Sequence, residues 1–164
     1  MRGEITETLP ASCEAAFDLT HDYTRRLDWD TLLSAAYLED GATQAARGAK
    51  ATCVGVGWLS RFALTTVYVS FDRPRVAAVK MVPGPTVDRP PLFATWAASI
   101  RHEAGPTDAE STITYTYNFT ARPRWLAWLV EPVMAWFFAR ETRQRLAAMR
   151  EYFRHSAGES RKNV

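Results

Sequence analysis

Residues 111–120 read STITYTYNFT, and this alternation decides the fold of the chain. Small polar side chains occupy the even positions, and the odd positions from 113 onward hold Ile113, Tyr115, Tyr117 and Phe119. A period of two is typical of a β-strand with one face on a core and the other toward solvent. The stretch therefore predicts a long strand whose aromatic face is buried.

After Pro123 the apolar side chains recur at spacings of three and four, which predicts a long amphipathic helix running to about His155. One face of this helix holds Ala135, Phe138, Thr142, Leu146, Met149 and Phe153. Proline suits the first turn of a helix, so we expect a short piece, Trp125–Val130, and a second piece that begins near Pro132. The polar tail, 158–164, is expected to fray.

The residues before this strand predict six further strands and two short helices. Segments rich in Val, Thr, Tyr, Phe and Trp cover residues 2–9, 32–39, 49–54, 63–71, 76–82 and 93–103. Ser12 can cap a first short helix, and Asp22 can cap a second one over residues 23–29. The connections between strands are too short for helical crossovers, so the sheet should be antiparallel.

A seven-stranded antiparallel sheet with one long C-terminal helix belongs to the α+β class. Twist would curl such a sheet around the helix, which would pack across the concave face. Any space that side chains leave between helix and sheet would receive a ligand. The length of 164 residues favours one domain, which we place at 1–157, with the polar tail at 158–164.

The charge balance and the apolar runs exclude two kinds of partner. There are 20 basic and 18 acidic side chains, which gives a net charge of +2. Nucleic-acid binding usually requires a strongly basic surface, which this balance does not favour. The most apolar stretch, 125–139, is divided by Glu131 and Pro132, whereas a membrane span needs about 20 residues. We therefore expect no nucleic-acid partner and no transmembrane segment.

Two cysteines, Cys13 and Cys53, are too few for a disulfide framework or a metal site. The first residues, Met1–Ile5, lack the apolar stretch of a secretory signal, so the predicted location is the reducing cytoplasm. Motifs such as HExxH, paired CxxC or a glycine-rich phosphate loop do not occur. We therefore expect no metal and no cofactor.

The histidines point to structure more than to chemistry. His21 is interpreted as a cap or turn residue, with a general base formed together with Asp22 as the alternative. His102 is placed at the end of a strand, in an exposed turn before Gly105.

The first forty residues are similar to a known family. Ala16–Leu19 (AFDL), then Asp22, then Arg25–Asp30 (RRLDWD) resemble the opening of the START-like, polyketide cyclase/aromatase superfamily (SRPBCC), which has the helix-grip fold. The later order agrees with it: a Pro–Gly interruption at Pro83–Pro85, the threonine–tyrosine strand, and then the long helix.

The resemblance implies a deep pocket between the long helix and the sheet for a hydrophobic or aromatic small molecule. Members bind lipids, sterols, hormones or polyketides, and a subset cyclises and dehydrates poly-β-ketone chains. In that subset, pocket residues fall at positions that Trp29, Tyr37, Ser70 and Lys80 could occupy here. The strand 67–72 (VYVSFD) departs from the cyclases because it has no inward-pointing arginine.

The residues themselves add further candidates for the wall of the pocket. By strand parity, Tyr115 and Tyr117 face the long helix, where they either pack as core or orient a carbonyl or hydroxyl group of a ligand. The remaining wall candidates are Tyr68, Trp96, Phe138 and Thr142.

Lys80 interrupts the apolar run Val76–Val82. It lies either on a solvated face or inside the cavity, where desolvation would lower its pKa. Inside the cavity it could polarise a ketone or hold an enolate. Lys80, Tyr115 and Ser70 are therefore the candidate catalytic residues.

Three functions remain open at this point. The first is binding of a lipid-like or polyketide-like molecule, and the second is an enzyme that cyclises or dehydrates a poly-β-ketone. The third is a membrane-surface or protein-interaction module built on the tryptophan-rich segment 125–138, with Trp125, Trp128 and Trp136. The simplest protein partner for that segment is a second copy of the chain, which would give a homodimer.

Overall fold

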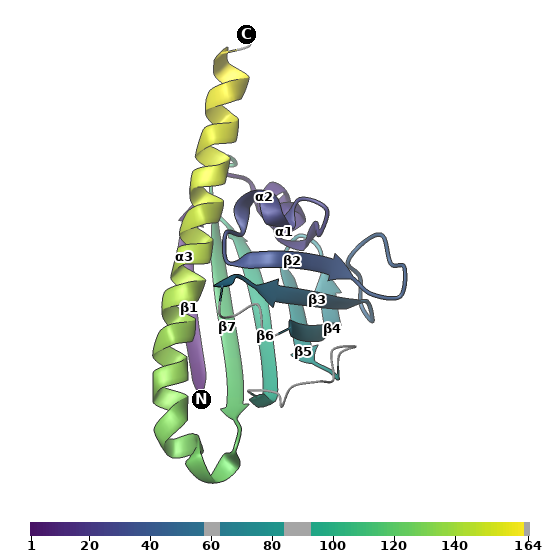
Figure 1. The fold of residues 1–164 in the computed structure, drawn as a ribbon. Coiled ribbons are helices and arrows are strands. Elements are labelled where there is room, and N and C mark those ends of the chain that lie inside the picture. The colour runs from purple at the N-terminus through teal and green to yellow at the C-terminus, as the bar shows by residue number, and fades with distance from the viewer. Residues whose placement is uncertain (58–62, 84–92, 163–164) are drawn as a thin grey trace.

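The computed structural model describes residues 1–57, 63–83 and 93–162, with side chains placed as far as Ser156 (Figure 1). The elements follow in the order β1 (Arg2–Leu9), α1 (Cys13–His21), α2 (Arg26–Trp29), β2 (Leu33–Leu38), β3 (Lys50–Gly55), β4 (Ala63–Asp72), β5 (Val76–Met81), β6 (Phe93–Ala104), β7 (Ser111–Ala121), the 3₁₀ turn η2 (Arg124–Leu126) and α3 (Ala127–Lys162). The predicted order of strands and helices is confirmed. The predicted break at Pro83–Pro85 extends outside the described residues.

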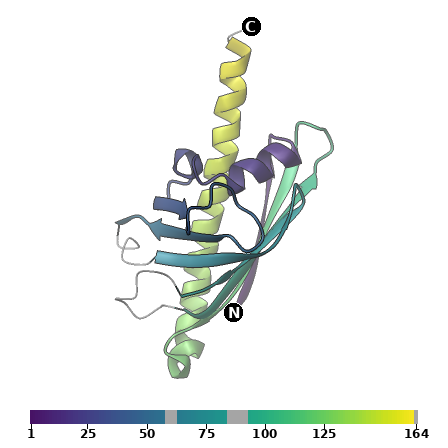
Figure 2. The same cartoon turned by 90° about the vertical axis from the view of Figure 1, so that its right-hand side faces the viewer.

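The seven strands form one sheet in the order β1-β7-β6-β5-β4-β3-β2, and every neighbouring pair is antiparallel. The sheet curls, and α3 runs along it while α1 and α2 lie beside the upper half of α3 (Figures 1 and 2). This arrangement is the predicted α+β helix-grip fold.

Cross-strand pairing aligns alternate residues of each strand on the inner face of the sheet. One inner row runs from Tyr68 through Val79, Ala98 and Tyr117 to Gly3. A Cβ atom on Gly3 would lie 2.4 Å from the phenol of Tyr117. The row ends in a glycine because the ring of Tyr117 occupies the space over β1.

The two short helices begin for different reasons. Ser12 caps α1 as predicted, since its hydroxyl accepts a hydrogen bond from the N–H of Ala15 at 3.2 Å. Asp22 does not cap a helix over residues 23–29. Its Oδ1 instead accepts from the N–H of Thr24 at 2.9 Å and from its hydroxyl at 2.6 Å. Because the carboxylate is engaged in this local turn, it does not cap a helix, and α2 begins only at Arg26.

Helix α3 is longer and less divided than the sequence predicts. Pro132 lies inside the continuous helix, which also extends beyond His155 to Lys162, so the predicted break and the predicted end of the helix are both wrong. Pro132 removes one hydrogen bond to the carbonyl of Trp128, and both residues are exposed. Water can therefore satisfy that carbonyl, and the helix continues.

Polar contacts attach α3 to the edge of the sheet at two places along the helix. Glu131 accepts a hydrogen bond from the N–H of Ala121 at 3.0 Å, and its second oxygen lies 3.5 Å from the N-terminal ammonium of Met1. Farther along α3, Arg150 forms an ion pair with Glu7 of β1. These contacts hold the helix in register with β1 and β7.

Candidate functional site

An aromatic cluster occupies the interior between the sheet and the first half of α3. The ring centroid of Phe138 lies 4.9 Å from that of Tyr117 and 6.2 Å from that of Trp96. Phe119 stacks beside Tyr117 at 6.3 Å, and the hydroxyl of Tyr117 donates to the carbonyl oxygen of Ala135 at 3.3 Å. The threonine–tyrosine strand and the long helix therefore meet through the side chains that the sequence predicted.

The apolar side chains around this aromatic cluster are only partly buried. Trp96, Tyr117 and Phe119 are buried, but the apolar side chains around them keep accessible surface although they pack against the same core. These half-buried residues are Leu64, Val79, Met81, Phe93, Met134, Ala135 and Phe138. Apolar accessible surface between a sheet and a helix is the usual lining of a small-molecule site.

A buried ion cluster lies at α2, next to the same core. Asp30 has no exposed surface, and the Nε atoms of Arg26 and Arg145 each lie 3.0 Å from its Oδ2. Arg26 also donates to the carbonyl oxygen of Thr20, and its guanidinium lies 4.6 Å from the ring of Trp29. Two guanidinium groups against one carboxylate leave an excess of positive charge, which favours oxygen-rich or anionic groups nearby.

A chain of hydrogen-bonded side chains lies close to this cluster. The hydroxyl of Tyr68 lies 2.9 Å from Nδ1 of His21 and 3.2 Å from the hydroxyl of Tyr23. Burial, together with the nearby charge of Arg26, lowers the pKa of His21 to about 3, so this histidine is neutral at pH 7. Burial raises the pKa of Tyr68 to about 12 and that of Tyr115 above its ordinary value. All three groups are therefore uncharged hydrogen-bonding groups.

Several buried polar atoms have no hydrogen-bond partner among the described residues. Nε1 of Trp29, Nε1 of Trp96 and Nε2 of His21 make no hydrogen bond within the described part of the chain. A buried donor without an acceptor costs about 1–3 kcal/mol. A ligand oxygen or a bound water next to the indole groups would remove that cost.

Most of the predicted pocket residues share this interior. They are Trp29, Trp96, Tyr115, Tyr117, Phe138 and Thr142, all of them buried except Phe138, which is half-buried. Tyr68 is also buried, but it belongs to a second core cluster with Phe17, Ala51 and Ala77.

Tyr37, Ser70 and Lys80 lie elsewhere. Tyr37 is 43% exposed on the edge strand β2, and Lys80 is exposed on the outer face of β5. A bulge after Tyr68 shifts the register of β4, so Ser70 pairs with Ala78 on the outer face instead of following Tyr68 inward. The solvated-face interpretation of Lys80 therefore agrees with the structure, and neither Lys80 nor Ser70 reaches the interior.

Other interior residues were missed or misplaced by the sequence analysis. The predicted site residues include neither Arg145 nor Asp30. The exposed turn predicted for His102 is wrong, because this residue is 2% exposed and its ring lies 5.4 Å from that of Phe17. Its parity with Ile100, two residues earlier in β6, is the sequence signal that would have placed it inside.

The buried histidines predict an acid-sensitive fold. Burial lowers the pKa of His102 to about 4 and that of His21 to about 3, from ordinary values near 6.5. Below about pH 6.5 the histidines of the unfolded chain bind protons, whereas those of the folded chain do not. Their contribution to the free energy of unfolding is therefore fully present above about pH 6.5 and is lost as the pH decreases. At about pH 5 each histidine should remove about 2 kcal/mol from the free energy of unfolding.

Urea unfolding at several pH values between about 7.5 and 5 measures this effect. His102→Leu should remove about half of the pH dependence, since His102 has no hydrogen-bond partner among the described residues. A variant with the same slope as the wild type would contradict the assignment. The carboxylate of Asp18, which pairs with Arg73, has a lowered pKa. It therefore changes the stability only at a lower pH than the histidines do.

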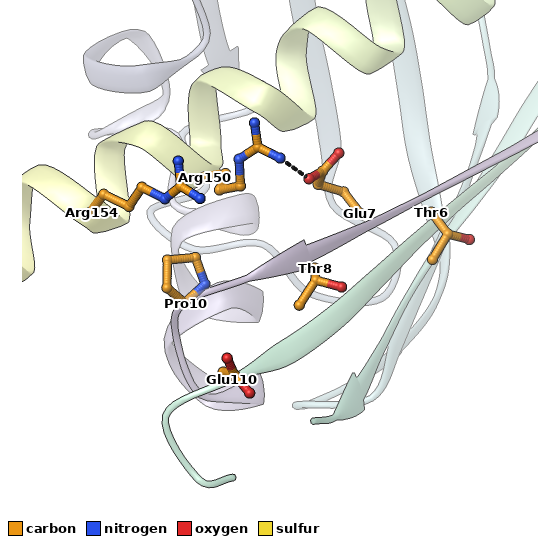
Figure 3. Close-up of a pocket in the computed structure, with 7 residues that line it drawn as sticks. All are labelled: Thr6, Glu7, Thr8, Pro10, Glu110, Arg150 and Arg154. Atoms are coloured by element: carbon orange, nitrogen blue, oxygen red, sulfur yellow. Dashed lines mark hydrogen bonds and ion pairs between the residues drawn. The ribbon is translucent and has the colours of Figure 1, made fainter. Parts of the chain in front are cut away.

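An open depression where α3 meets the edge strand β1 is lined by Thr6, Glu7, Thr8, Pro10, Glu110, Arg150 and Arg154. In Figure 3, the Glu7 side chain points toward α3 and meets Arg150, while Thr6 points away from the helix. Its lining is polar, and its central contact is the ion pair that attaches α3. Among the described residues, no group of three or more His, Cys, Asp or Glu side chains is placed to hold a metal ion.

Solved structures share this fold at low sequence identity. TTHA0849 from Thermus thermophilus superposes with a TM-score of 0.72 at 11% identity, covering 95% of this chain and 99% of that one. The di-domain ARO/CYC protein BexL from the BE-7585A biosynthetic pathway gives a TM-score of 0.66 at 13% identity, covering 92% of this chain and 45% of BexL. Ara h 8.0201 gives 0.62 at 12% identity, covering 93% and 97%.

Sequence comparison identifies the family. A search of curated proteins gave no significant match. The family model described as polyketide cyclase / dehydrase and lipid transport matches residues 2–154, which is nearly the whole chain. With the helix-grip fold and the aromatic interior, this match shows that the chain belongs to the polyketide cyclase / dehydrase and lipid transport family.

Proposed function

We propose that the protein binds an apolar small molecule with hydrogen-bond-accepting oxygens between the sheet and the first half of α3. One observation carries the proposal. The interior combines apolar surface that side chains leave accessible with buried N–H groups that have no acceptor within the described ranges. The family, whose description names polyketides and lipid transport, supports a ligand of this kind.

The apolar part of the ligand would lie against the half-buried side chains. Met81 and Val79 of β5 and Phe93 of β6 supply the sheet side of that surface, and Met134 and Phe138 supply the helix side. Burying such surface contributes about 25 cal/mol per Å². Methionines suit a site of this kind because their flexible thioether adapts to ligand shape.

The oxygen-bearing part would lie toward the polar groups of the interior. Trp96 offers an indole N–H that has no acceptor among the residues the structure describes, and the neutral hydroxyl of Tyr115 is buried near Arg26 and Arg145. Arg145 contacts Asp30 through Nε, and its side chain keeps 22% of its surface exposed. A carbonyl, enol or acid oxygen would be stabilised by these donors and by the excess positive charge.

Two tryptophan substitutions on the same strand test the proposal. Met81→Trp places an indole inside the interior, whereas Lys80→Trp places the same group on the outer face of β5. We expect the wild type to take up the fluorescent probe anilinonaphthalene sulfonate (ANS), an apolar ring system with an acidic oxygen group. Met81→Trp should weaken ANS binding about tenfold or more, and Lys80→Trp should leave it unchanged.

Melting temperatures close to that of the wild type would show that both variants fold. A wild type that binds no ANS would overturn the proposal. Equal weakening in both variants would also overturn it, because the probe would then bind without entering the interior.

A second candidate function, cyclisation or dehydration of a poly-β-ketone, is favoured by the buried His21–Tyr68–Tyr23 chain. Tyr68 keeps its proton at neutral pH, and its contact with His21 gives a route for proton transfer. Tyr68→Phe should abolish product formation from a poly-β-ketone thioester while ANS binding is kept. Product formation by the wild type at the spontaneous rate would exclude this activity.

A further inference from the structure

The outer side of η2 and of the first half of α3 carries an apolar surface that no other element in the described part of the chain covers. Trp125, Trp128 and Trp136 are 77%, 76% and 67% exposed, and Leu129 and Val133 are 53% and 66% exposed. We call these five residues the tryptophan face. Isolated apolar side chains on a surface are ordinary, but five large ones within three helical turns form a contiguous patch.

This surface is not a misplaced part of the core. The opposite side of the same helical segment already packs on the sheet through Met134, Ala135 and Phe138. The first half of α3 therefore has two apolar sides, and the side with Met134, Ala135 and Phe138 is the one that packs against the sheet. Tryptophan is enriched where a protein meets a membrane surface, because its ring is apolar and its N–H is polar.

The most exposed charged side chains around the tryptophan face are arginines. Arg122, Arg124, Arg140 and Arg143 are exposed. Within 122–143, the acidic residues are Glu131 and Glu141, whose side chains are 18% and 19% exposed and lie near the N-terminal ammonium and Arg140. A partner for this surface should therefore be apolar and negatively charged.

We propose that the tryptophan face docks on an anionic lipid surface. Tryptophan and leucine side chains would enter the interface between headgroups and acyl chains, and the four arginines would meet the anionic headgroups. A second copy of the chain fits less well, because a symmetric contact would bring two sets of exposed arginines together.

The position of the segment allows such contact. Figures 1 and 2 show η2 and the start of α3 at one end of the molecule, beyond the ends of the neighbouring strands. A flat surface can approach this end without meeting the rest of the sheet. Among the described residues, no helix is both long enough and apolar enough to cross a membrane, so the contact is peripheral.

Vesicle co-sedimentation tests the proposal with the full chain. We expect binding to phosphatidylcholine vesicles that contain about 30% phosphatidylglycerol, weak binding to pure phosphatidylcholine, and loss of binding at high salt. Trp128→Ser/Trp136→Ser should reduce binding about tenfold or more, and Arg140→Glu/Arg143→Glu should abolish the preference for anionic vesicles.

Tyr37→Ser/Val69→Ser is the matched control, because it removes two exposed apolar side chains from the sheet, away from α3. It should bind vesicles as the wild type does. The tryptophan variants should keep the wild-type melting temperature, since their side chains are exposed. Three results would overturn the proposal: no binding by the wild type, equal binding by the tryptophan variants, or a wild-type dimer that these variants dissociate without any vesicle binding.

Discussion

Replacing Asp30 with alanine is expected to lower the free energy of unfolding by about 3–5 kcal/mol. Asp30 is fully buried and lies 3.0 Å from the Nε atoms of both Arg26 and Arg145. Without its carboxylate, the buried guanidinium of Arg26 would lose its charge partner in a region of low dielectric. Urea unfolding followed by circular dichroism measures the loss.

Asp18→Ala is the matched control for this variant. Asp18 also pairs with an arginine, since its carboxylate oxygens lie 2.7 Å from Nε and Nη2 of Arg73, but both side chains are more than half exposed. Its loss should cost about 1 kcal/mol or less. Equal losses in the two variants would contradict the prediction, because burial would then not increase the contribution of the Asp30 ion pairs to the free energy of unfolding.

Replacing Tyr117 with alanine is expected to lower the free energy of unfolding by about 3–5 kcal/mol. Tyr117 is 2% exposed and packs at 4.9 Å on Phe138, so its ring acts as a core residue at the contact between β7 and α3. Tyr37→Ala, on the exposed edge strand, should change stability by less than about 0.5 kcal/mol. A small loss for Tyr117→Ala would mean that its ring borders the ligand space instead.

The order of strands and helices could be predicted because local patterns determine it. The alternation in 111–120 gave the parity of Tyr115 and Tyr117 directly, since one side of that strand is polar throughout. The run Val76–Val82 is apolar on both faces, so alternation alone left the orientation of Lys80 open. At Ser70 the bulge in β4 changes the parity, and no local signal marks it.

The polar part of the interior could not be predicted because its residues meet only in the folded chain. Asp30 and Arg145 are 115 residues apart, and their contact depends on how α2 sits against α3. Likewise, His21 at the end of α1 meets Tyr68 in the middle of β4. Helix α3 continues through Pro132 because the carbonyl that loses its hydrogen bond, that of Trp128, belongs to an exposed residue. The sequence alone does not indicate this exposure.

The central claim, that the interior between the sheet and α3 binds an apolar ligand, is tested most directly by locating a bound probe. Nuclear Overhauser contacts between ANS and the methyl groups of the ¹³C-labelled protein would do this. The account predicts contacts to Leu64, Val79, Met81 and Met134, which pack on the interior. Contacts restricted to the exposed methyl groups of Val69 or Val133 would place the probe outside and contradict the claim.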